Sequence, residues 1–154
     1  LAVLEGSSIF YVDKIESTEV IKADLGVGRS YPAYSTSLGK AILAFTPEKK
    51  VIALFKDQEF KTFTSNTVSS LDELLAQLKM IRRKGYAYDN EELIPGLACV
   101  AAPVRNYEGE PMAAISVAFP RYRYLSGSEE EKRIIELVGE VTSKISEEFG
   151  FSSF

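Results

Sequence analysis

The sequence contains no histidine and only one cysteine among its 154 residues. Without histidine the chain cannot build Ser-His or Cys-His nucleophile pairs, and it lacks the commonest ligand of transition metals. A single cysteine excludes an internal disulfide and agrees with the reducing environment of the cytoplasm. We therefore expect no catalytic residue, no metal site and no cofactor, and we expect a cytoplasmic protein.

The chain also lacks a basic excess and a long apolar run. It has 18 Lys and Arg against 22 Asp and Glu, a net charge of −4, so it offers no phosphate-binding surface of its own. The longest uncharged run of the core region, residues 93–104, is far shorter than the ~20 residues of a membrane span. No signal-peptide pattern opens the sequence. We expect no membrane partner and no direct binding of DNA by these residues.

The composition that remains is that of an ordinary globular domain. Hydrophobic residues make up 45% of the chain, so residues 1–154 are expected to form one domain around one core. The sequence opens at Leu1, inside an apolar segment, which indicates a fragment of a longer protein.

The stretch from Gly85 to Phe119 is the centre of the predicted fold. It contains a strand, an acidic turn and an almost uncharged hairpin over residues 97–106 and 111–119, typical of strands covered on both faces. The two-residue period separates a bulky face from a face of small residues. The bulky face comprises Val100, Val104, Ile115, Val117 and Phe119; the small face comprises Cys99, Ala101, Ser116 and Ala118, with Asp89 just upstream. Small residues leave room for either a packed helix or a ligand.

Other strands are predicted before this stretch. Residues 1–5 and 9–16, separated by Gly6-Ser7-Ser8, predict a hairpin, and residues 19–25 predict a third strand. Residues 26–32 contain two glycines and a proline and predict a loop.

Four helices are indicated by their capping residues. The predicted starts are at Ser35-Thr36-Ser37, Thr46-Pro47, Ser70 with Glu73, and Ser128 with Glu131, and Gly85 is the C-cap of the third helix. The inner stripe of the last helix is predicted as Ile134, Ile135, Val138, Val141, Ile145 and Phe149. Runs of strands with helices segregated between them favour an α+β fold with an antiparallel sheet.

Four short blocks occur in a characteristic order. They are YVDKIE at residues 11–16, YPAYSTSLGKAILA at residues 31–44, GYAYDNEE at residues 85–92 and GLACVAAPV at residues 96–104. Through these blocks the chain resembles the C-terminal effector-binding domain of IclR-type transcriptional regulators, over residues 1 to about 150. The resemblance implies a GAF-like fold, in which helices flank a central antiparallel sheet of about five to six strands.

The resemblance also implies a function. Such a domain binds a small effector and forms dimers or tetramers, and a winged helix-turn-helix, which these residues do not include, binds DNA. Carried over by position, the family's effector pocket falls on Ser37, Leu38, Gly39, Asp89, Cys99 and Ser116, with Ala118 beside it and a wall near Val20 and Ala23.

One departure from the family pattern concerns the ligand. Where the family often has Ser-x-Ser-Gly-Pro, this chain has Ser116-Val117-Ala118-Phe119-Pro120, so the second hydroxyl and the glycine are missing. This difference allows a more apolar or aromatic effector than a small polar acid.

Each of these residues also has a plain structural reading. Residues 37–39 could form an ordinary capped helix start, Asp89 a solvated turn, Cys99 a core contact, and Ser116 a hydroxyl bonded to backbone. Lys40 is expected to face solvent or to pair with an acid, and Glu91 and Glu92 are expected to be surface or interface charges. Two other functions compete with effector binding: a structural oligomerisation domain, and an enzyme that uses Asp89 and Cys99 on small acids.

Overall fold

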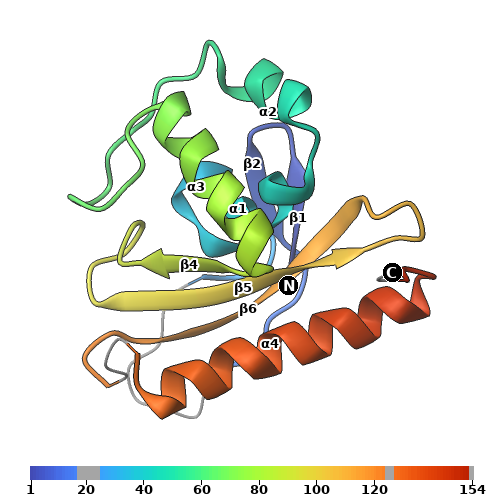
Figure 1. Cartoon of the computed structure of the whole chain (residues 1–154). Coiled ribbons are helices and arrows are strands. Elements are labelled where there is room, and N and C mark those ends of the chain that lie inside the picture. Colours follow the sequence, from blue (N-terminus) through green and yellow to red (C-terminus); the bar gives the residue numbers. More distant parts are fainter. Residues whose placement is uncertain (17–24, 124–126, 153–154) are drawn as a thin grey trace.

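In the computed structural model, residues 1–16, 25–123 and 127–152 are described. Within them, six antiparallel strands form one sheet, combined with four α-helices and one short 3-10 helix (Figure 1). The predicted α+β class and antiparallel sheet are therefore confirmed. Within the described ranges, no helix is both long enough and apolar enough to cross a membrane.

The sheet has the strand order β3-β2-β1-β6-β5-β4. The strands are β1 (Ala2–Glu5), β2 (Ser8–Tyr11), β3 (Ser30–Pro32), β4 (Ala87–Asn90), β5 (Leu97–Arg105) and β6 (Pro111–Pro120). The long β5–β6 hairpin lies near the middle, and the first hairpin, β1–β2, continues the sheet beyond β6. The hairpin predicted as the centre of the fold is thus the centre of the sheet.

The helices cover both faces of this sheet unequally. One face carries the 3-10 helix η1 (Ala33–Ser35), α1 (Ser37–Phe45), α2 (Glu48–Phe55) and α3 (Leu71–Lys84), whereas α4 (Glu129–Glu148) alone crosses the other (Figure 1). The larger hydrophobic core lies under the first group, and a smaller one lies under α4.

The two faces of the β5–β6 hairpin differ as predicted. Cys99 pairs with Ala118 and Ala101 with Ser116, so these small side chains share the face on which α1 packs. Val100, Phe119 and Val138 meet in the smaller core beneath α4. Because small residues let a helix backbone approach the sheet closely, α1 lies deep in the domain, and most of its residues are buried.

The helices begin and end near their predicted capping residues, but the capping-box glutamates bond to a different N–H group than expected. The Ser70 and Ser128 hydroxyls accept the N–H groups of Glu73 and Glu131, each at 3.2 Å. The two glutamates bond one residue further back than a capping box requires, to the N–H groups of Ser69 and Gly127. Gly85 ends α3 in the left-handed conformation with φ 82°. The second helix begins at Glu48, with Pro47 as its N-cap.

The third strand differs from the prediction. Residues 30–32, predicted as a loop, form the edge strand β3, and their register pairs Ser8 with Pro32 and Phe10 with Ser30. A proline is tolerated there because it ends an edge strand, where its missing N–H breaks no ladder. The second strand ends at Tyr11 instead of residue 16. The strand predicted for residues 19–25 lies almost wholly outside the described residues.

The predicted inner stripe of α4 is only partly correct. Val138 is buried and Ile134 and Ile135 pack against the smaller core, but Val141 and Phe149 are 44% and 50% exposed. Thr142 and Ser146 are buried in their place. Their hydroxyls donate to helix carbonyls one turn earlier, which removes the penalty for burying them.

Candidate functional site

The start of α1 is a compact, buried segment with polar groups. Thr36 is its N-cap, and the Thr36 hydroxyl accepts the Gly39 N–H at 3.0 Å. The first intrahelical bond runs from the Lys40 N–H to the Thr36 carbonyl, so the N–H groups of Ser37 and Leu38 precede it. Of the three predicted backbone donors, Gly39 is therefore already committed within the helix cap.

Gly39 has a packing role. A Cβ at this position would overlap the backbone oxygen and Cα of Ala33 in η1. Only glycine lets α1 lie directly against that turn. Leu38, 1% exposed, belongs to the larger core. Both residues build the frame of the predicted pocket, in agreement with the plain structural reading.

Asp89, Cys99 and Ala118 lie in one row across three strands. Asp89 on β4 pairs with Cys99 on β5, and Cys99 pairs with Ala118 on β6. The Ser37 side chain is near enough to Cys99 to lower the pKa of its thiol, which places the start of α1 above this row. Ser37, Asp89 and Cys99 are all buried. The structure thus brings three of the predicted residues into one buried polar cluster.

The pKa of the buried Asp89 carboxyl is raised so far that the group is only partly ionised near pH 7. Burial raises its pKa from 3.8 to about 7, and the nearby Glu92 carboxylate adds to the rise. The hydrogen bond from the Glu92 N–H to Asp89 Oδ1, at 2.7 Å, and the charge of Lys40 oppose it. A carboxyl group with a pKa near 7 can either donate or accept a hydrogen bond. Asp89 is therefore not the solvated turn residue of the alternative reading.

Cys99 is the opposite of an activated thiol. Its complete burial raises its pKa well above the ordinary value, and the Asp89 carboxylate raises it further. A thiol in this state stays protonated and is a poor nucleophile. Cys99 can therefore line a pocket but cannot attack a substrate.

Ser116 and Ala118 lie at the edge of the cluster. Ser116 is half-buried and pairs with Ala101, one row away from Cys99, and Ala118 is exposed. This part of the small-residue face is open in the described structure. Val20 and Ala23, predicted as a wall, lie outside the described residues.

Tyr11 belongs to the same cluster and was not predicted. It pairs with Ala2, so its side chain shares the small-residue face. Its pKa is raised by burial and by the neighbouring Cys99, Tyr31 and Asp89. Its ring packs edge-on against Tyr31 at 5.9 Å. Tyr11 lies in the YVDKIE block, which could have marked it as a site residue. Its closeness to Asp89 depends on the order of the strands in the sheet, which the sequence does not reveal.

A buried ion pair lies beside the cluster. The Lys40 ammonium, 1% exposed, donates to Glu92 Oε1 at 2.5 Å, to Gln77 Oε1 at 3.0 Å and to the Tyr88 carbonyl at 3.4 Å. These contacts tie α1 to α3 and to the turn after β4. Of the two environments expected for Lys40, the structure shows the pairing with an acid, and Glu92 is a buried ion-pair partner instead of a surface or interface charge.

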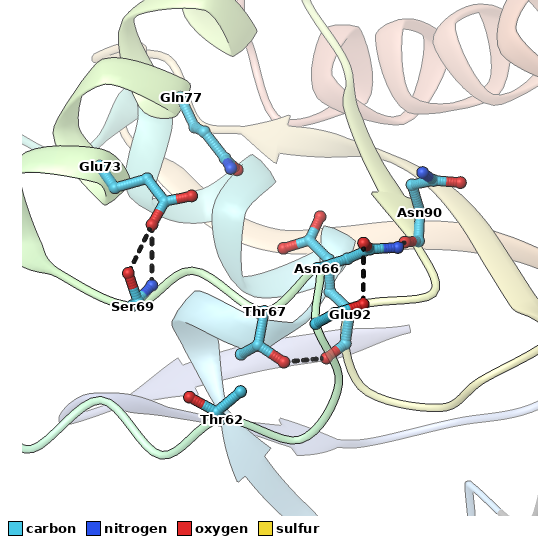
Figure 2. Close-up of a pocket in the computed structure, with 9 residues that line it drawn as sticks. Thr62, Asn66, Thr67, Ser69, Glu73, Gln77, Asn90 and Glu92 are labelled. Carbon is cyan, nitrogen blue, oxygen red and sulfur yellow. Dashed lines mark hydrogen bonds between the residues drawn. The ribbon is translucent and has the colours of Figure 1, made fainter.

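Two clefts among the described residues lie away from this cluster. One of about 470 Å³ is lined by Thr62, Ser65, Asn66, Thr67, Ser69, Glu73, Gln77, Asn90 and Glu92 (Figure 2). The other is a groove between α4 and the ends of α3 and β5. Within the described ranges, no three acidic, cysteine or histidine side chains gather as metal ligands would.

Comparison with known proteins identifies the family. Residues 1–147 match the model of the family described as bacterial transcriptional regulator IclR C-terminal. The chain is 34% identical, over all of its 154 residues, to the HTH-type transcriptional regulator KdgR of Dickeya chrysanthemi, and it spans only 50% of that protein's length.

Solved structures agree with this match. The crystal structure of the C-terminal domain of Escherichia coli KdgR aligns over 97% of this chain and 85% of that one, with 33% identity and a TM-score of 0.83. The Thermotoga maritima IclR structure aligns over 97% of this chain and 60% of that one, with 33% identity and a TM-score of 0.91. The chain therefore belongs to the IclR family of bacterial transcriptional regulators, as the C-terminal regulatory domain of such a protein and not as an enzyme.

Proposed function

We propose that this domain binds a small carboxylate-bearing effector against the small-residue face of the sheet, beneath the start of α1. The observation that carries the proposal is the buried polar cluster of Ser37, Asp89 and Cys99, which opens toward Ser116 and Ala118. Several buried polar groups in one cluster, one of them with a strongly raised pKa, are typical of a binding site.

The chemistry of the cluster suits a carboxylate. The Ser37 hydroxyl and the N–H groups of Ser37 and Leu38 lie at the positive end of α1, and the Ser116 hydroxyl can donate from β6. Asp89, with its pKa raised to about 7, can carry a proton and donate it in a hydrogen bond to an anionic ligand. An ionised Asp89 would repel the same ligand, so we expect binding to weaken above pH 7.

The apolar part of the ligand would lie over Cys99 and Ala118. Alanine at position 118 supplies a methyl group where the family often has a hydroxyl, which favours an aromatic or aliphatic body. The inducer-binding domain of PobR from Acinetobacter, crystallised as a double mutant with 3-hydroxybenzoic acid, shares this fold, with a TM-score of 0.80 and 21% identity. That complex supports an aromatic acid as a first candidate.

The effector would act through the position of α1. Lys40 joins α1 to α3 and to the β4 turn, so a ligand that shifts α1 biases this whole unit. In the full protein, that bias would pass to a winged helix-turn-helix outside these residues, in a dimer or tetramer. Leu137 and Val141, exposed on α4, offer an apolar stripe for subunit contact.

A thermal-shift screen of this chain against keto acids, hydroxy acids and aromatic carboxylates tests the proposal. A ligand at 100 times its dissociation constant adds about 2.7 kcal/mol of stability. We expect the rise in melting temperature to shrink in Ser37→Ala and Ser116→Ala, but not in the control Ser143→Ala, which changes an exposed residue of α4. A ligand that stabilises all four proteins equally would place binding elsewhere.

A second function, a structural oligomerisation domain without a ligand, is favoured by one observation. Leu38 and Gly39 are packed into the frame of the domain, and the two clefts lie away from the cluster. No stabilisation by any acid of the screen, together with a stable dimer in analytical ultracentrifugation, would select this function.

A further inference from the structure

The polar cleft on the far side of the Asp89–Glu92 turn has the features of a second site. It lies between the loop of residues 62–69, the first turns of α3 and the turn after β4 (Figure 2). Its volume is about 470 Å³, and its lining consists of hydroxyl, amide and carboxylate side chains. It shares no lining residue with the effector cluster described above.

Glu92 supplies the observation that points to a ligand. Its side chain is buried, yet within the described residues its Oε2 atom accepts no hydrogen bond. The other oxygen, Oε1, is occupied by Lys40 at 2.5 Å. Figure 2 shows the Glu92 carboxylate in the cleft, between the side chains of Gln77 and Asn66. A buried carboxylate oxygen without a donor is costly, so it favours any molecule that brings one.

The backbone around Glu92 holds it in this position. The Glu92 N–H donates to Asp89 Oδ1 at 2.7 Å, and the Glu92 carbonyl accepts the Thr67 hydroxyl at 2.6 Å. On the facing loop, Asn66 Nδ2 donates to the Asn90 carbonyl at 2.9 Å. Because loop and turn are bonded to each other, and because Lys40 holds Oε1, the carboxylate is kept in this orientation. The acceptor is fixed in place before a ligand arrives.

The surrounding charges select a neutral ligand. A cation on Oε2 would be repelled by the Lys40 ammonium, which already pairs with the same carboxylate. An anion would meet the carboxylates of Glu73 and Glu92. Hydroxyl groups both donate and accept, and they match a lining of serine, threonine, asparagine and glutamine side chains.

We propose that this cleft binds a neutral molecule with several hydroxyl groups, one of which donates a hydrogen bond to Glu92 Oε2. The site is independent of the carboxylate effector proposed above. It adds a second input to the domain, because Glu92 contacts both Asp89 and Lys40.

The test is a nuclear magnetic resonance titration of the 154-residue chain with D-glucose and with glycerol, each to about 50 mM. Polyols stabilise most proteins by exclusion from their surface, so residue-specific shifts are measured instead of melting temperature. We expect saturating shifts at the amides of Asn66, Thr67 and Gln77. Binding should be about tenfold weaker in Glu92→Gln, which keeps an acceptor for Lys40 but offers an amide donor toward the ligand.

Asn66→Ala is a second variant that leaves the buried ion pair intact, and Ser143→Ala on α4 is the control. Weaker binding in Asn66→Ala with unchanged binding in the control supports the site. Shifts that do not saturate, or that are equal in all variants, overturn it and leave an oxygen that is hydrated by water only. Saturation by acetate or methylammonium in place of the polyols overturns the assignment of a neutral ligand.

Discussion

Replacing Asp89 with asparagine should remove a pH-dependent loss of stability. Folding raises the pKa of the Asp89 carboxyl from 3.8 to about 7, so the folded protein keeps a proton that the unfolded chain releases. Below pH 3.8 the group is protonated in both states. Between pH 3.8 and about 7 only the unfolded chain ionises, and the free energy of unfolding falls as pH rises. Above pH 7 both states are ionised, and the loss is complete.

The size of the effect follows from that interval. At 1.36 kcal/mol per pH unit, the rise from 3.8 to about 7 corresponds to about 4 kcal/mol. Relaxation around the buried carboxylate reduces this figure, so we expect about 2 to 4 kcal/mol. Asparagine does not ionise, and its Oδ1 can still accept the Glu92 N–H. Asp89→Asn should therefore gain stability over the natural chain as pH increases, and be the more stable protein at pH 8.

Urea unfolding of both proteins at pH values from 4 to 8 measures this difference. The control is Asp57→Asn, because the Asp57 side chain is 88% exposed. Its ion pair with Lys56 is a long surface contact, with 3.8 Å between Lys56 Nζ and Asp57 Oδ2. The difference between Asp89→Asn and the natural chain should widen up to about pH 7 and then stay constant, while the control stays parallel. A parallel curve for Asp89→Asn would refute the buried, proton-binding state of this carboxyl group.

Three further predictions concern the stability of α1 and α4. Gly39→Ala should lower stability by about 1–3 kcal/mol or more, since its Cβ overlaps Ala33; an unchanged urea midpoint would contradict this contact. Lys40→Met should cost about 3–5 kcal/mol by leaving Glu92 unpaired, and adding Glu92→Met should recover much of it; an equally unstable double variant would argue against the ion pair as the cause. Ser128→Ala should cost about 1 kcal/mol through loss of the α4 cap, detectable in the same urea assay, and an effect below 0.3 kcal/mol would show that the Glu131–Gly127 bond suffices.

The sequence predicted the parts of the fold that depend on local pattern. Capping residues located the starts of the helices, and the alternation of side chains along residues 97–119 identified which face lies under α1. The third strand was misplaced because Ser30–Pro32 has no alternation of its own. It is a strand only because β2 lies beside it. The C-terminal half of α4 was mispredicted because Thr142 and Ser146 are buried there, and a hydrophobic pattern does not place polar residues on an inner stripe.

The residues of the cluster were predictable where each lies in one of the blocks that resemble the family. Ser37, Asp89 and Cys99 come together as expected, since the sheet register aligns Asp89 with Cys99 and the start of α1 lies above them. Tyr11 and Glu92 were missed for a different reason. Their importance depends on which strand borders which, and on a lysine that no hydrophobic pattern would place inside the protein.

The tightly packed residues around the buried cluster differ from the exposed end of the small-residue face, and this difference has an evolutionary consequence. Lys40, Glu92 and Gly39 each have contacts that a substitution would break at a large cost in stability. Ser116 and Ala118, in contrast, are half-buried and exposed, and changes at such positions usually alter stability by less than about 0.5 kcal/mol. In the proposed effector site, a related domain could therefore acquire a new ligand preference by changing only these two positions. Its scaffold would tolerate such drift without an accompanying stabilising substitution.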